Sequence, residues 1–390
     1  MKKTALIMVI FLFSTGVFAS ENNNIRVLVA RQVAKASLAG QFTLDNLPSV
    51  NISGNQQAFN ILPTTNGFSV NGQLAEVPYV SVTSYGSPIY YNGRSYIGSL
   101  IFRNEKGLLS VINVLPIEEY LVGLVASEMP KNWPTESLKA QAVVARTYAM
   151  FQRKGRNSAW SSSPYDVEST VLDQVYRGNV VNDKLVRNAV EETKGEYLTL
   201  NGKLLKTFFS STCGGKTESA KNVWNEAYEI PIIEDPYCSR APNMKWNYTI
   251  SKVGLVERLK KAGFKAQSID DIKIERRPNN PRVATIQIDI GPETVVLQGN
   301  EFRKMLGYNL VKSTWFDAKI SFGDVHFRGR GYGHGVGMCQ WGAKGMAEAG
   351  KDYRQILEYY YPGARIEAAA KEEQVLDQKN FKKIKKRKFR

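Results

Sequence analysis

Between residues 25 and 114 the chain repeats one pattern, in which a short apolar run is followed by an Asn-Gly dipeptide. These dipeptides are Asn66-Gly67, Asn71-Gly72 and Asn92-Gly93, and runs rich in aromatic and β-branched residues flank them. Asn and Gly tolerate the positive φ angles of two-residue hairpin turns, so the pattern predicts consecutive β-hairpins. We therefore expect residues 20–114 to form an N-terminal β-rich module.

The pattern changes to a helical period at Pro116. Pro116 suits a first helical turn, and apolar residues at helical spacing follow it until Met129-Pro130 ends the helix near Glu128. A second helix is expected from Thr135 to Gln152. Further helices are predicted at 183–195, 253–262 and 356–361, and strands at 197–200, 204–210 and 283–290. Hairpins with inserted helices predict an α+β fold, not an alternating βαβ fold.

The two ends of the chain differ from its body. Residues 1–19 combine Lys2 and Lys3, a short apolar core and Val17-Phe18-Ala19, which is typical of a secretory signal peptide cleaved before Ser20. The last twelve residues contain eight basic side chains, within a predicted basic tail at 367–390. The net charge is +16, and without this run, Lys2 and Lys3 it is 16 − 10 = +6. A mildly basic body does not favour a nucleic-acid partner.

Three cysteines are present, Cys213, Cys238 and Cys339. In an exported protein Cys213 and Cys238 are candidates for a disulfide, which leaves Cys339 over. Zinc binding is the alternative, although the chain has two histidines and no C-x-x-C pair. The sequence does not decide between the two, and we predict no metal and no cofactor in the active site.

Two charged residues on the predicted helices are candidates for chemistry. Glu128 lies at a helix end among apolar neighbours, where burial raises the pKa of a carboxyl and lets it donate a proton. Arg146 lies on a helix face of small residues, which favours pairing with a carboxylate or a substrate group. Each residue also has a purely structural interpretation. Glu128 would then be a surface glutamate at a helix end, and Arg146 an arginine whose aliphatic part packs along the helix.

Glycine occupies every second position from 329 to 337. On a strand this spacing leaves one face without side chains, so a ligand or another backbone can approach closely. The opposite face would carry Tyr332 and His334, and Trp341 follows, which indicates a site for stacking on sugars. The spacing does not match a dinucleotide-binding fingerprint. The turn at 210–215, which contains Ser211 and Gly214, also suits close contact with a polar ligand.

The order of these motifs resembles the stage II sporulation protein D family, also called the amidase-enhancer family. The resemblance covers residues 25–366 and is carried by the motifs Ser127-Glu128-Met129-Pro130, Ala145-Arg146-Thr147-Tyr148, Asp173-Gln174-Val175-Tyr176, Ser210-Ser211-Thr212-Cys213-Gly214-Gly215 and Gly329 to Ala343. It implies a catalytic core at 115–366 and a glycan-binding groove between the β modules and the helices. Some relatives bind zinc through His and Cys after the second helix, but residues 147–212 contain neither.

The family resemblance implies a lytic transglycosylase that cuts peptide-stripped peptidoglycan strands. Glu128 would act as the single general acid and base that forms 1,6-anhydro-muramyl ends, with Arg146 orienting it. Residues expected along the groove are Ser211, Gly214, Tyr332, His334, Gln340 and Trp341. The alternatives are a non-catalytic wall-binding protein that stimulates an N-acetylmuramoyl-L-alanine amidase, and an envelope scaffold. The signal peptide predicts a periplasmic or cell-wall location, where the basic tail would contact anionic envelope polymers.

Overall fold

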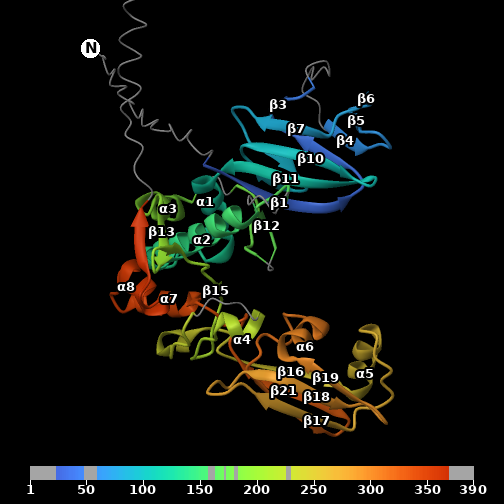
Figure 1. The fold of residues 1–390 in the computed structure, drawn as a ribbon, viewed down its shortest axis with the longest axis vertical. Helices are drawn as coiled ribbons and strands as arrows, with labels where there is room; N and C mark the ends of the chain where they lie inside the picture. The colour runs from blue at the N-terminus through green and yellow to red at the C-terminus, as the bar shows by residue number, and fades with distance from the viewer. Residues whose placement is uncertain are drawn as a thin grey trace, which may run out of the picture.

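A computed structural model describes residues 23–47, 59–156, 163–170, 173–179, 183–224 and 230–368. It confirms a mixed α+β fold (Figure 1). The predicted signal peptide at 1–19 and the basic run at 379–390 lie outside the described residues. Among the described helices, none is both long enough and apolar enough to cross a bilayer.

Two six-stranded sheets form the N-terminal part of the molecule. The first has the order β12 (Val167–Glu168), β1 (Asn24–Val33), β11 (Leu108–Pro116), β10 (Ser99–Glu105), β7 (Tyr79–Ser84) and β3 (Phe42–Leu44). The second has the order β6 (Gln73–Ala75), β5 (Phe68–Val70), β4 (Phe59–Pro63), β2 (Ala36–Ala39), β8 (Ile89–Tyr91) and β9 (Arg94–Tyr96).

Two of the three predicted Asn-Gly turns are confirmed, whereas Asn66 and Gly67, which end the 64–67 connection between β4 and β5, both lack positive φ. Asn71 and Gly72 both have positive φ between β5 and β6, and so do Asn92 and Gly93 between β8 and β9. Positive φ at both central residues is the geometry that makes Asn-Gly favourable in a two-residue turn.

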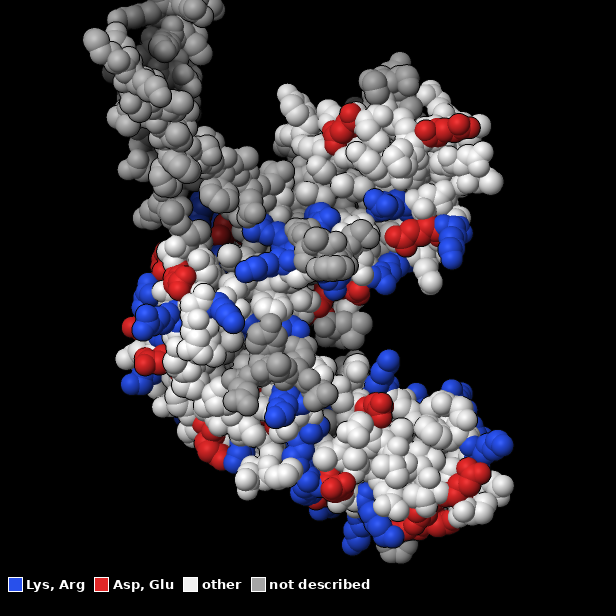
Figure 2. Space-filling view, in the orientation of Figure 1, with Lys and Arg blue, Asp and Glu red and all other residues white. Residues whose placement is uncertain are grey.

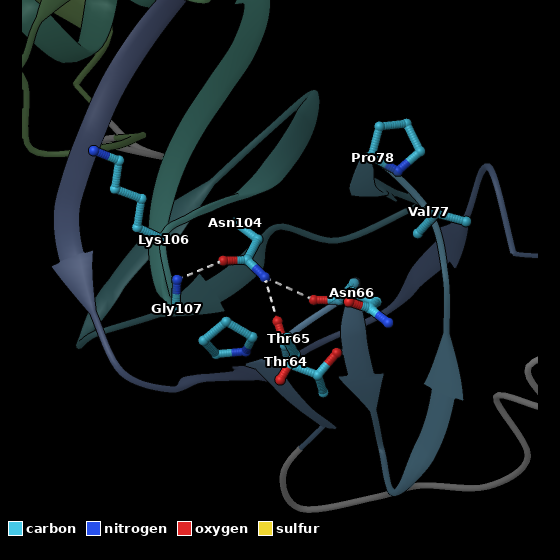
Figure 3. A pocket seen from close by; sticks show the side chains of 10 residues that line it. Thr64, Thr65, Asn66, Val77, Pro78, Asn104, Lys106 and Gly107 are labelled. Carbon is cyan, nitrogen blue, oxygen red and sulfur yellow. Dashed lines mark hydrogen bonds between the residues drawn. The ribbon is translucent and has the colours of Figure 1, made fainter.

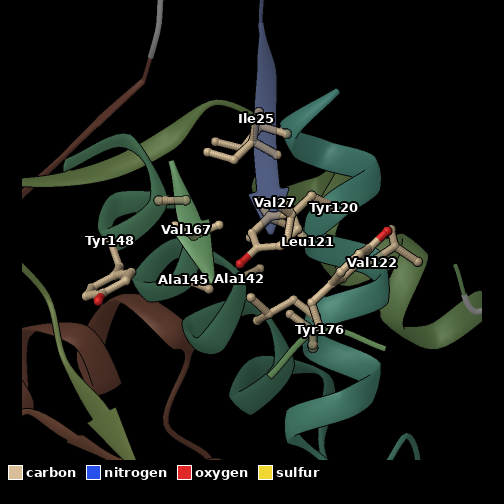
Figure 4. Packing of buried hydrophobic residues seen from close by; sticks show 14 of the residues in the cluster. Ile25, Val27, Tyr120, Leu121, Val122, Ala142, Ala145, Tyr148, Val167 and Tyr176 are labelled. Carbon is tan, nitrogen blue, oxygen red and sulfur yellow. The ribbon is translucent and has the colours of Figure 1, made fainter. Parts of the chain in front are cut away.

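Two helices, α1 (Ile117–Glu128) and α2 (Thr135–Arg156), pack against the first sheet, and a third, α3 (Lys184–Glu192), packs against both of them. α1 and α2 match the predicted helices closely, and α3 is capped by the Asp183 side chain. Figure 4 shows Ile25 and Val27 of β1 packed against Tyr120 and Leu121 of α1. This buried cluster extends on both sides of residue 114, so the β module and the helices share one hydrophobic core.

Two separate stretches, 196–240 and 338–368, supply short elements that pack beside the helices. β13 (Glu196–Leu200) lies between β14 (Lys203–Leu204) and β23 (Arg365–Ala368), while β15 (Phe209–Ser210) pairs in parallel with β22 (Met338–Cys339). Around them lie α4 (Ala220–Trp224), the 3₁₀ helix η1 (Pro236–Arg240), α7 (Gln340–Glu348) and α8 (Tyr353–Tyr360).

Residues 245–330 form a second unit with its own core. One sheet has the order β16 (Lys245–Ser251), β21 (Asp324–Arg330) and β20 (Phe316–Ser321), and the other has β17 (Asp271–Arg276), β18 (Val283–Asp289) and β19 (Thr294–Gln298). α5 (Lys252–Lys261) and α6 (Gly299–Leu306) contribute to the same buried cluster. The space-filling view shows a broad notch between this unit and the N-terminal sheets (Figure 2).

The prediction of an extended strand with a bare face at 329–337 is wrong. β21 ends at Arg330, and Gly331, Gly333, Gly335 and Gly337 all have positive φ, which is not a strand conformation. The physical reason is close approach to residues 208–213. A Cβ on Gly337 would lie 2.1 Å from the Phe208 carbonyl oxygen. The glycines therefore admit another backbone, which was one of the two expected uses of the bare face.

Candidate functional site

Glu128 is the last residue of α1, and its carboxylate is held by two amide donors. The Val175 backbone N–H donates to Oε1 at 2.8 Å, and the Gln340 Nε2 amide donates to Oε2 at 3.3 Å. Burial raises the pKa of the Glu128 carboxyl above its ordinary value, while these hydrogen bonds and the charge of Arg177 act in the opposite direction. The site thus contains a desolvated carboxyl with a raised pKa, as the sequence predicted.

The loop at 173–179 delivers the Val175 donor. It packs along α1 at Gly123, where a Cβ would lie 2.4 Å from the Gly178 carbonyl oxygen. The Tyr120 hydroxyl donates to Gln174, and the Tyr176 hydroxyl donates to Asn113. The sequence did not assign this role to Val175, because a backbone donor leaves no signature in the side chain.

Gln340 and Trp341 lie at the start of α7, beside Glu128. Gln340 is buried and also donates to Oε1 of Gln141 at 3.4 Å. Trp341 forms an edge-to-face pair with Trp133, with ring centroids 4.9 Å apart. Its backbone N–H donates to the Ser211 carbonyl oxygen at 3.1 Å. The structure therefore brings together Glu128, Gln340, Trp341 and the backbone of Ser211.

Gln141 is a site residue that the sequence analysis missed. It is fully buried on α2, and within the described residues its amide nitrogen has no hydrogen-bond partner. A glutamine on an otherwise small and apolar helix face, next to Ala142 and Ala145, was the available signal.

Arg146 does not contact Glu128, which corrects the prediction that it orients this carboxyl. Its Nε and Nη2 atoms lie 3.0 and 2.6 Å from the carboxylate oxygens of Glu118, at the opposite end of α1. The guanidinium also donates to the carbonyl oxygens of Glu196 and Val190. The more general expectation that Arg146 pairs with a carboxylate is confirmed, and its contacts join α1, α2, α3 and β13.

The remaining predicted groove residues have other neighbours. The Tyr332 hydroxyl donates to Asn309 at 2.6 Å, and the Arg330 Nε donates to the Gly214 carbonyl oxygen at 3.1 Å. His334 lies in an aromatic cluster, 5.0 Å from the Trp224 ring centroid. Burial, together with nearby Arg303 and Arg282, lowers the pKa of His334 to about 3, so its ring is neutral near pH 7.

Trp341 also lines a surface hollow of about 290 Å³ that includes Tyr237, Arg240 and Lys344. The Lys344 ammonium lies 5.2 Å from the Trp341 ring centroid and 5.9 Å from that of Trp133. Aromatic faces beside polar groups suit sugar rings, so this hollow is a candidate carbohydrate-binding surface, although its lining residues include neither Gln340 nor Glu128.

A second hollow of about 820 Å³ lies in the N-terminal sheets (Figure 3). Asn104 donates from its amide to the carbonyl oxygens of Thr64 and Gly67 and accepts from the Gly107 N–H. Lys106 and Pro78 complete the wall. The residues that line it include no carboxylate, so it offers no general acid.

Of the two alternatives that the sequence left open, the disulfide between Cys213 and Cys238 is not formed. All three cysteines are free and buried, and the Cys213 and Cys238 sulfur atoms lie 3.6 Å apart, whereas a disulfide bond measures about 2.0 Å.

Comparisons with known proteins agree with the arrangement of the motifs. The stage II sporulation protein family matches residues 105–200, and a domain family of unknown function, DUF8618, matches residues 233–337. The chain is 39% identical over 279 residues to an uncharacterized protein of Brachyspira hyodysenteriae, which covers 70% of this chain and 73% of that protein.

Two relatives in Bacillus subtilis have descriptive names. Stage II sporulation protein D is 33% identical over 273 residues, which cover 67% of this chain and 76% of that protein. The amidase enhancer is 30% identical over 380 residues, which cover 85% of this chain, and the chain spans about half the length of that relative (51%).

Proposed function

Because the chain belongs to the stage II sporulation protein D family, we propose that it is a lytic transglycosylase that cleaves peptide-stripped peptidoglycan strands. One observation carries the proposal. Glu128 is a desolvated carboxyl with a raised pKa, and both of its oxygens accept hydrogen bonds from uncharged amides. Such a group can give up a proton and then take one back.

The proposed reaction uses this one carboxyl twice. Protonated Glu128 donates its proton to the glycosidic oxygen as the bond from that oxygen to the muramic acid C1 breaks. The muramic acid C6 hydroxyl then attacks C1, and the Glu128 carboxylate removes the hydroxyl proton as the 1,6-anhydro ring closes. Glycosidases that use water ordinarily need a second carboxylate, and the intramolecular hydroxyl removes that requirement.

The two amide donors stabilise the ionised carboxylate of Glu128, which exists between the two proton transfers. After the first proton transfer, Val175 and Gln340 hydrogen-bond to a carboxylate instead of a neutral acid. Hydrogen bonds to a charged group are about twice as strong as those between neutral groups. The hollow lined by Trp341 is the proposed position for one sugar ring of the bound strand.

Product analysis tests the proposal directly. Purified protein is incubated with peptide-free glycan strands, and anhydro-muramyl ends are measured by mass spectrometry. We expect wild type and Glu119→Gln to produce them and Glu128→Gln to produce none. Glu119 lies on the same helix and pairs with Arg187 at the surface, so it controls for the chemical change alone. An unchanged yield with Glu128→Gln would contradict the proposal.

The similarity to an amidase enhancer favours a second candidate, a non-catalytic protein that stimulates a cell-wall amidase. Under this candidate the rate of an added amidase rises equally with wild type and Glu128→Gln, and no anhydro ends form. Both candidates place the protein outside the cytoplasm after export, with the basic tail in contact with anionic envelope polymers. Fractionation of cells that express the full chain tests that location.

A further inference from the structure

One buried cluster has no role in the proposed reaction. Three thiols and one carboxylate, those of Cys213, Cys238, Cys339 and Asp235, meet in the interior. One atom from each residue lies within 4.8 Å of the corresponding atom of each other residue, and all four residues are buried. They come from three segments, namely the turn after β15, the start of η1, and the junction of β22 with α7.

The distances between these donor atoms suit a tetrahedral metal ion. The Cys213 sulfur lies 3.6 Å from the Cys238 sulfur and 3.0 Å from Oδ2 of Asp235. Zinc–sulfur bonds of about 2.3 Å in a regular tetrahedron place the sulfur atoms roughly 3.8 Å apart. The spacing of these donor atoms is therefore close to that of a tetrahedral zinc site.

The surrounding backbone supplies donors that suit a thiolate ligand. The N–H groups of Cys213 and Gly342 lie 3.2 and 3.3 Å from the Cys339 sulfur, which is at the N-terminus of α7. Backbone N–H groups of this kind orient metal ligands and stabilise their charge. Arg282, whose side chain is fully buried, donates to the Cys213 carbonyl oxygen at 2.5 Å and adds a positive charge nearby.

We propose that Cys213, Cys238, Cys339 and Asp235 bind one Zn²⁺ ion in a closed, structural site. Four protein ligands fill a tetrahedral shell and leave no open position for water or substrate, which is typical of structural zinc. A disulfide would use two of the sulfurs and leave the third thiol and the Asp235 carboxylate buried beside it. The donor set thus favours the metal over the disulfide.

The proposed ion would hold together the segments that carry Ser211, Gln340 and Trp341. The Ser211 carbonyl oxygen accepts from the Trp341 N–H, and Cys339 directly precedes Gln340. Binding at Cys339 therefore fixes the start of α7, from which Gln340 reaches Glu128. The four residues are positioning residues in this account, because the metal does not meet the substrate.

Metal content and thiol number provide the first test. Full-length protein is purified in reducing buffer without added metal, and bound metals are measured by plasma mass spectrometry. We expect about one zinc per chain in wild type and a roughly tenfold loss in Cys339→Ser and Cys238→Ser. Asp166→Asn, which removes a buried aspartate paired with Arg26 in the N-terminal sheet, should retain the metal.

Cobalt binding to the wild type keeps the test independent of variants that fail to fold. Metal-free protein is prepared with a chelator and titrated with Co²⁺ alone, and its absorption is recorded. We expect thiolate-to-cobalt charge-transfer bands and the ligand-field bands of tetrahedral cobalt, which saturate at about one ion per chain. Thiols in the zinc-loaded protein should react with a thiol reagent only after chelation.

Two outcomes overturn the zinc site. One is protein without metal in which two thiols are lost to a disulfide. The other is protein without metal that has three freely reactive thiols and shows no cobalt bands. Both measurements use no glycan, so the zinc site and the transglycosylase proposal succeed or fail separately.

Discussion

The buried ion pair between Arg146 and Glu118 makes it possible to distinguish a structural role of Arg146 from a catalytic one. The Arg146 side chain is 1% exposed and that of Glu118 is 13% exposed, with 2.6 Å between Nη2 and Oε2. Removing one partner of a buried pair leaves the other charge uncompensated, which costs about 3–5 kcal/mol. We expect Arg146→Met to lower the free energy of unfolding by about 3 kcal/mol, the lower end of that range, because water partly reaches Glu118.

The double variant Arg146→Met/Glu118→Leu separates a structural role from a catalytic one. With both charges removed, most of the lost stability should return, and the coupling energy should be at least about 2 kcal/mol. Stability is measured by urea unfolding, and cleavage of peptide-free glycan is measured on the folded protein. We expect near wild-type cleavage by the double variant. A double variant as stable as wild type but unable to cleave glycan would refute this reasoning and assign the Arg146–Glu118 pair to the reaction.

Three further predictions follow from the geometry. His334, with its pKa lowered to about 3, is deprotonated in the folded state, so the unfolded state takes up a proton first as the pH falls below about 6.5. Wild type should lose at most about 2 kcal/mol of stability between pH 7 and pH 5 on this account. Urea unfolding measured across this pH range should show a weaker pH dependence in His334→Gln than in wild type. Gly123→Ala would place a Cβ against the Gly178 carbonyl oxygen, so we expect it to lower the free energy of unfolding, measured by thermal unfolding, by about 1–3 kcal/mol. The same variant should also lower glycan cleavage. Trp341→Ala should weaken binding of peptide-free glycan roughly three- to tenfold in calorimetry, and equal affinities would exclude this ring from the binding surface.

The helices and hairpins could be predicted because their signals are local. Pro116 and Pro130 bracket α1, and Asn-Gly pairs lie at the hairpin turns between β5 and β6 and between β8 and β9. In each case the information lies within a few residues of the element it determines. The position of Glu128 at a helix end followed from the same local signals.

The parts that the sequence did not predict depend on contacts between distant segments. β12 pairs in parallel with β1, and β16 pairs with β21, across separations that no local pattern reports. Alternating glycines indicated a strand, but Gly331, Gly333 and Gly337 closely approach residues 208–213, Gly335 approaches the Arg282 guanidinium, and each has a positive φ. The partner of Arg146 was misassigned for the same reason, because α1 carries Glu118, Glu119 and Glu128 and sequence spacing does not identify which of them Arg146 contacts.

Arg146 pairs with Glu118 and not with Glu128, and this arrangement suits the proposed chemistry. A guanidinium within hydrogen-bond distance would lower the pKa of Glu128 and deplete the protonated form that the first step requires. Val175 and Gln340 are uncharged, so they stabilise the carboxylate without adding a full positive charge. Burial outweighs these hydrogen bonds and the nearby charge of Arg177, and so keeps the pKa of Glu128 raised. A single carboxyl that must act first as an acid and then as a base is better served by amide donors than by a cation, and Arg146, bound to Glu118, acts at the other end of the same helix by holding α1 in place.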